Sequence, residues 1–141
     1  MIRQLSIYAE NAKGNMKNIT QTLADEGINM NTLITNDSAE FGIIRMLVSD
    51  PDRAEAAIRR AGFMCRVDWV LAVEVKDDAG SLNTLLQVLL DGNINIDYLY
   101  VTYSSLSKLP VAIMRTQDLF EVEEFLNAKG YQNVERIADN P

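Results

Sequence analysis

The chain repeats its own sequence, and this duplication restricts its possible folds more than any other feature. The stretch from Gly14 to Met30 returns 66 residues later as the stretch from Gly80 to Ile96. Residues further along return 68 positions later: Asp50, Ile58, Gly62 and Phe63 match Asp118, Leu126, Gly130 and Tyr131. A unit of about 66 residues is too long for a solenoid repeat and has the length of a small domain. We therefore expect two domains, residues 1–68 and 69–141.

Hydrophobic periodicity predicts the same order of elements in both copies, β-α-β-β-α-β. The first copy has strands at Leu5–Tyr8, 29–35, Phe41–Val48 and from Met64, a turn at Asn36-Asp37-Ser38, and helices at Met16–Gly27 and Pro51–Gly62. The second has strands at Leu71–Val75, Ile96–Tyr103, Leu109–Arg115 and Asn133–Arg136, and helices at Ser81–Asp91 and Leu119–Lys129. This order predicts an α+β fold of two tandem ferredoxin-like βαββαβ modules, with antiparallel sheets, helices on one face, and the modules packed side by side.

The boundary between the copies contains no linker. Residues 64–75 include neither glycine nor proline, and they are largely apolar. We therefore expect the last strand of the first copy to lead directly into the first strand of the second.

Composition excludes several classes of partner. The chain has 20 acidic and 13 basic residues and a net charge of −7, which disfavours nucleic acids and anionic membranes. No apolar run is long enough for a membrane span or a signal peptide. The single cysteine, Cys65, cannot form an internal disulfide, and we expect it to be an inert thiol in the core. These features favour a cytoplasmic protein.

Histidine is absent from the sequence. Acid–base catalysis by imidazole is therefore excluded, and so is the commonest ligand of zinc and copper. With one cysteine as well, we expect no metal site, no cofactor and no catalytic residue. We predict that the protein is not an enzyme.

The most distinctive motif is a strand, a polar turn, a glycine and a helix, followed later by an asparagine at a strand start. In the second copy its residues are Asp77, Gly80, Leu82, Asn95 and Ile96; in the first they are Asn11, Gly14, Met16, Gly27, Asn29 and Met30. Over essentially the whole chain, this pattern resembles the ACT domain, a small amino-acid-sensing module of metabolic regulation. The proline that this family usually has before the glycine is Lys13 in one copy and Ala79 in the other, and Asn93 replaces Gly27.

The physical chemistry of such a loop suits a small zwitterion. Free amides at a helix start favour a carboxylate, and an Asn or Asp side chain can accept from an α-ammonium group. The ACT resemblance implies a ligand held between modules, which would pair Asn11 and Gly14 with Asn95, and Asp77 and Gly80 with Asn29. The candidate ligand-binding residues are Asn11, Ala12, Gly14, Asn15, Met16, Asn29, Met30, Asp77, Ala79, Gly80, Ser81, Leu82, Asn95 and Ile96. The two loops differ in charge, so the two sites need not bind equally, and the Asp77 loop matches the family better.

Some residues of these motifs also have a purely structural interpretation. Gly14 and Gly80 could allow close helix–sheet packing, Asn29 and Asn95 could be turn residues, and Asp77 with Asp78 could cap a helix.

Two functions compete. The first is a non-catalytic regulatory protein that binds a free amino acid or a similar small zwitterion. The alternative is an interaction or regulatory subunit of a metabolic enzyme, without a ligand of its own. A small enzyme is disfavoured, because neither loop has the arginine of a phosphate loop. A homodimer is expected in either case, since sheet edges remain to be covered.

Overall fold

The computed structural model describes residues 1–36 and 41–139, which form two compact units. Residues 3–68 form one unit, here the N-terminal module, and residues 1–2 with 69–139 form the other, the C-terminal module. Most of the turn predicted at Asn36-Asp37-Ser38 lies outside the described residues. No helix in the described part of the chain is long and apolar enough to cross a membrane.

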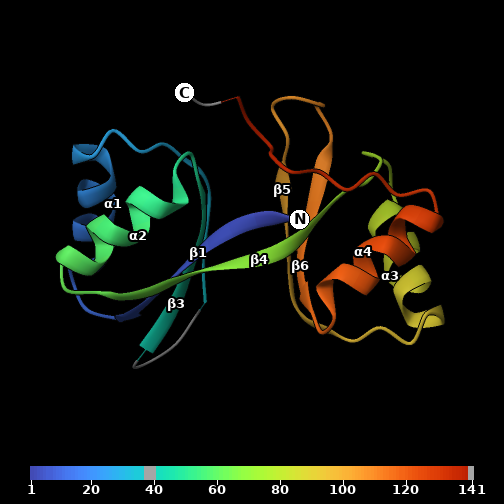
Figure 1. The fold of residues 1–141 in the computed structure, drawn as a ribbon, viewed down its shortest axis with the longest axis horizontal. Coiled ribbons are helices and arrows are strands. Elements are labelled where there is room, and N and C mark those ends of the chain that lie inside the picture. The colour runs from blue at the N-terminus through green and yellow to red at the C-terminus, as the bar shows by residue number, and fades with distance from the viewer. Residues whose placement is uncertain (37–40, 140–141) are drawn as a thin grey trace. The chain divides into compact units, whose positions relative to one another are not determined.

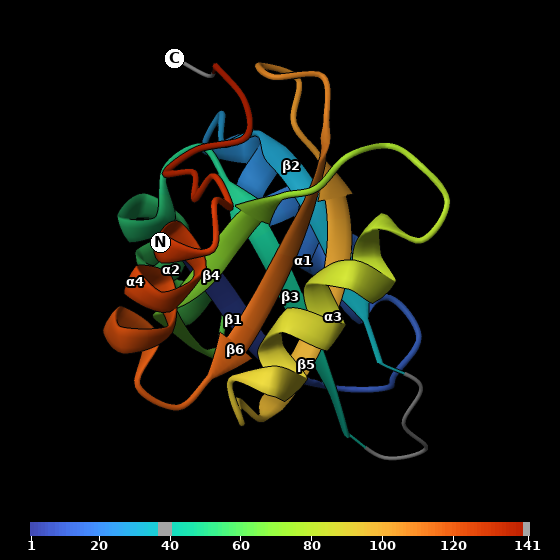
Figure 2. The same cartoon turned by 90° about the vertical axis from the view of Figure 1, so that its right-hand side faces the viewer.

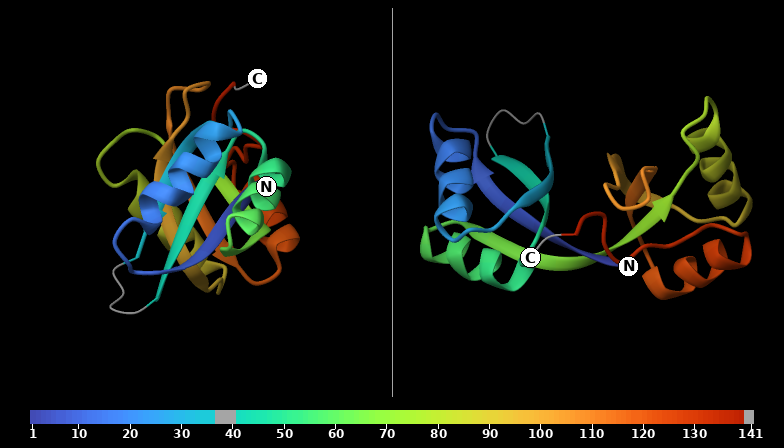
Figure 3. Two further views of the ribbon diagram at one scale, coloured as in Figure 1. Left: turned by 90° about the vertical axis from the view of Figure 1, so that its left-hand side faces the viewer. Right: turned by 90° about the horizontal axis from the view of Figure 1, so that it is seen from above.

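The N-terminal module follows the predicted order of elements (Figure 1). Its elements are β1 (Ile2–Glu10), α1 (Asn15–Asp25), β2 (Met30–Thr35), β3 (Phe41–Val48), α2 (Pro51–Arg60) and the first part of β4 (Met64–Glu74). Strand β3 pairs antiparallel with both β1 and β2, and the strand order is β2-β3-β1-β4. Helices α1 and α2 lie together on one face of these strands (Figure 3).

Alternation along the strands builds the core of this module. Leu5 and Ile7 of β1 lie opposite Met46 and Ile44 of β3, and all four are buried. The helices cover this face with Ile19, Leu23, Ala54 and Ile58. Helix α2 begins as the sequence predicts, because the Asp50 side chain accepts a 3.1 Å hydrogen bond from the Arg53 amide and a proline follows the cap.

The C-terminal module repeats this arrangement (Figure 2). It contains the rest of β4, then α3 (Ser81–Asp91), β5 (Ile96–Tyr103), β6 (Pro110–Thr116) and α4 (Leu119–Ala128). Strand β6 pairs antiparallel with β4 and β5, in the order β4-β6-β5. Its core contains Leu71, Val73, Ala112 and Met114 from the strands and Leu85, Leu89, Val122 and Leu126 from the helices.

Two details differ from the sequence prediction. First, β4 is one unbroken strand that contributes to the strand order of both modules, so the expectation of two separate sheets is corrected. Second, the closing strand expected at Asn133–Arg136 is only an isolated bridge between Val73 and Asn133. Beyond this bridge, Glu135 and Arg136 are exposed, and the Ile137 carbonyl accepts a hydrogen bond from the Ser105 amide. The pairing with β4 therefore does not extend to these residues.

Candidate functional site

Both glycines of the repeated motif are the N-caps of helices, in almost the same conformation. Gly14 precedes α1 with φ 90° and ψ −13°, and Gly80 precedes α3 with φ 88° and ψ −5°. A Cβ atom added to either would meet nothing within 4 Å. The interpretation that these glycines allow close packing is therefore wrong, and the left-handed backbone is what requires them.

These two helix starts have no side-chain cap. In both copies the first helical amide bonds to a carbonyl three residues back, from Asn15 to Ala12 and from Ser81 to Asp78, each at 3.2 Å. The next amides of the first turn have no intrahelical acceptor and can donate to water or to a ligand. Asp77 and Asp78 are exposed and do not cap α3 through their side chains, so the capping interpretation is also wrong.

The loop and the strand start of one copy lie at opposite ends of its first helix. Helix α1 has 11 residues, so Gly14 and Asn29 are separated by roughly 16 Å of helix. Helix α3 separates Gly80 from Asn95 in the same way. A ligand of amino-acid size therefore cannot contact both parts of the motif within one copy, and the two-module site implied by the family resemblance stays a prediction.

The residues of the first loop border a hollow of about 430 Å³. Its lining includes Asn11, Ala12, Asn15 and Met16, together with residues 42–44 of β3. Asn15 Nδ2 donates to the Glu10 carbonyl at 2.9 Å, which fixes the loop. Most of the first set of candidate residues thus shares one surface.

The second loop borders a larger hollow of about 870 Å³. Ala79, Gly80 and Ser81 line it together with Lys76 from the end of β4 and Lys129 and Tyr131 from the end of α4. Sequence reasoning missed these last three residues. A comparison of the two copies could have pointed to them, because they differ in type from the matching residues of the first copy. Those matching residues are Glu10, Ala61 and Phe63.

The remaining candidates lie elsewhere. Asn29 donates from Nδ2 to Asn31 Oδ1 at 3.0 Å, and its amide donates to Ser49 Oγ at 3.0 Å. Leu82 and Ile96 pack against the core of the C-terminal module, so they have a structural role in their own module. Met30 is exposed, at 36%, as is Met16 beside the first hollow, at 38%. Asn95 lines a third hollow, next to α4.

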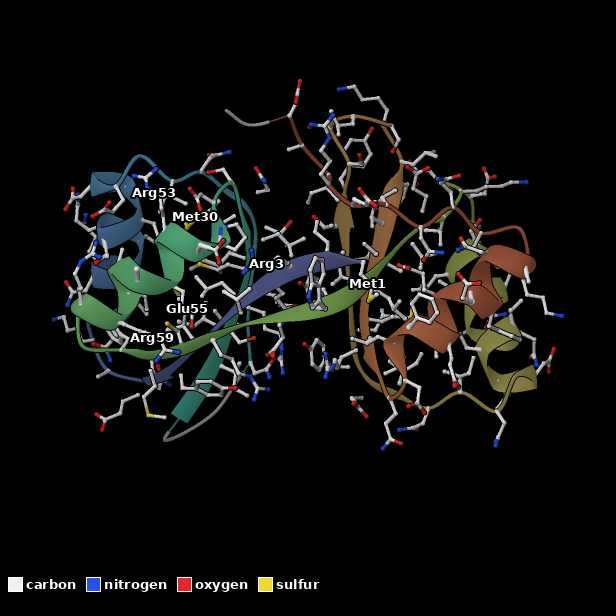
Figure 4. All side chains as sticks on the ribbon, viewed as in Figure 1. Met1, Arg3, Met30, Arg53, Glu55 and Arg59 are labelled. Carbon is white, nitrogen blue, oxygen red and sulfur yellow. The ribbon has the colours of Figure 1, made fainter. Side chains whose placement is uncertain are left out.

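Several ionisable groups away from the loops have partners within the fold. Arg3 donates to both carboxylate oxygens of Asp52, at 3.0 and 2.6 Å, and this contact lowers the pKa of Asp52. Glu55 and Arg59 form an ion pair of 2.7 Å along α2 (Figure 4). Burial raises the pKa of the Cys65 thiol, which agrees with an inert core cysteine.

The fold and the loops define a class of protein: a tandem pair of small α+β modules. In each module, the first helix follows a left-handed glycine and has no side-chain cap. The chain belongs to the ACT domain family, because residues 1–138 match the family model for the ACT domain pair. The match covers both modules, as the resemblance in the sequence implied.

Solved structures have the same fold. Protein BT0572 from Bacteroides thetaiotaomicron is 29% identical, with a TM-score of 0.86 over 94% of this chain and 91% of its own. The regulatory subunit of aspartate kinase from Thermus thermophilus has the same fold at 13% identity, with a TM-score of 0.64 over 91% of this chain and 90% of that one. The corresponding subunit from Thermus flavus has a TM-score of 0.61, at 13% identity, over 89% of this chain and 88% of that one. No curated protein matches the chain.

Proposed function

We propose that this protein is a non-catalytic regulator that binds a free amino acid or a similar small zwitterion at its glycine-led loops. One observation carries the proposal: the duplicated chain keeps a left-handed glycine and an uncapped helix start at both loops. A glycine at the N-cap has no side chain to accept from the first helical amides, so these amides stay available as donors. Such free amides can bind an anionic group of a ligand.

The regulated target would be an enzyme of metabolism. Two proteins of the same fold are named as regulatory subunits of aspartate kinase, and they span a similar length. The ligand's carboxylate would bind the amides of Gly80 loop residues or of their Gly14 counterparts. Its ammonium group would be accepted by Asn or Asp side chains of the motif, with a second module or a second copy of the chain completing the site.

The test is a thermal-shift screen of the twenty amino acids, with calorimetry for any that stabilise the protein. Ser81→Asp adds a carboxylate at the first position of α3, where it suits the helix dipole but repels a ligand carboxylate. Met16→Asp puts a carboxylate at the exposed second position of α1, in the first copy, and leaves the Asn15 hydrogen bond in place. We expect one of these variants to abolish the ligand's effect while the protein stays folded, which also shows which loop binds.

The opposite result has a clear meaning. If none of the amino acids stabilises the protein, the ligand proposal fails. Co-purification of the ligand-free protein with an enzyme would then favour the interaction subunit without a ligand.

A further inference from the structure

We draw no further inference here: the strongest candidate, the apolar flank of α3 where Leu86 and Leu90 are exposed, carries no proposal, because nothing in the described part of the chain shows what covers it.

Discussion

Gly14 and Gly80 have the same left-handed backbone at the same place in two copies of the fold, and neither is crowded by its surroundings. The conformation, rather than lack of space, therefore explains why both copies have a glycine here. Neither helix start has a side-chain cap, so amides of its first turn remain available to donate.

The first prediction concerns this conformation. Gly80→Ala should lower the free energy of unfolding by about 1 kcal/mol, because alanine in a left-handed conformation is strained. Gly80→Asn should cost less, since asparagine tolerates positive φ. Urea denaturation of both variants measures the difference. If alanine and asparagine cost the same, backbone strain is not the reason for the glycine.

The duplication made most of the fold predictable, because local signals occurred twice and in register. Asp50 followed by proline marked the start of α2, and the structure confirms it. The closing strand near Asn133 was predicted wrongly. A strand exists only where its backbone pairs with a neighbouring strand, and local sequence does not show the extent of that pairing. Asn133 forms one bridge with Val73, and the ladder stops there.

The candidate site was predictable only in part. The loop glycines and their helix starts follow from the repeat, but the hollow beside Gly80 joins residues 74–84 to residues 129–132, which only the folded chain brings together. The contacts of Arg53 had the same limit, because its hydrogen bond to the Glu26 carbonyl joins residues 27 positions apart in the sequence.

A second prediction concerns a buried hydroxyl. Thr116 is 2% exposed, and its Oγ1 has no hydrogen-bond partner in the described part of the chain. The first copy has Val48 at the matching position, where it packs in the core. Thr116→Val should raise the free energy of unfolding by about 1 kcal/mol, because an unsatisfied buried polar group is removed.

The control for this change is Thr22→Val. The Thr22 hydroxyl donates to the Asn18 carbonyl at 2.8 Å, so its removal should not stabilise the protein. Chemical denaturation of the two variants gives the comparison. A loss of stability in Thr116→Val would mean that the hydroxyl has a partner that this structure lacks.

A third prediction concerns pH. The hydrogen bonds from Arg3 lower the pKa of Asp52. A carboxyl group whose pKa is lower in the folded state stabilises the protein above its unfolded pKa, and this contribution is lost as pH falls through the folded pKa. We expect this loss of stability below about pH 4, in the range where aspartate titrates.

Arg3→Gln should therefore raise the pKa of Asp52 towards its ordinary value, as measured by NMR titration of the side-chain carboxyl carbon. Asp52→Asn should make the melting temperature less dependent on pH between about 4 and 2. An unchanged Asp52 pKa in Arg3→Gln would show that the ion pair does not persist in solution.

The last prediction concerns the cysteine. Cys65 is 6% exposed, its Sγ donates to the Glu55 carbonyl at 3.5 Å, and burial raises the pKa of its thiol. Since the thiolate is the reactive form, alkylation by iodoacetamide at pH 8 should be at least about a hundredfold slower in the folded protein than in urea. The double variant Met64→Cys/Cys65→Ala moves the thiol by one residue, to a position on β4 that is 74% exposed, and it should react rapidly when folded. Similar rates for the two folded proteins would show that Cys65 is accessible, contrary to its place in the core.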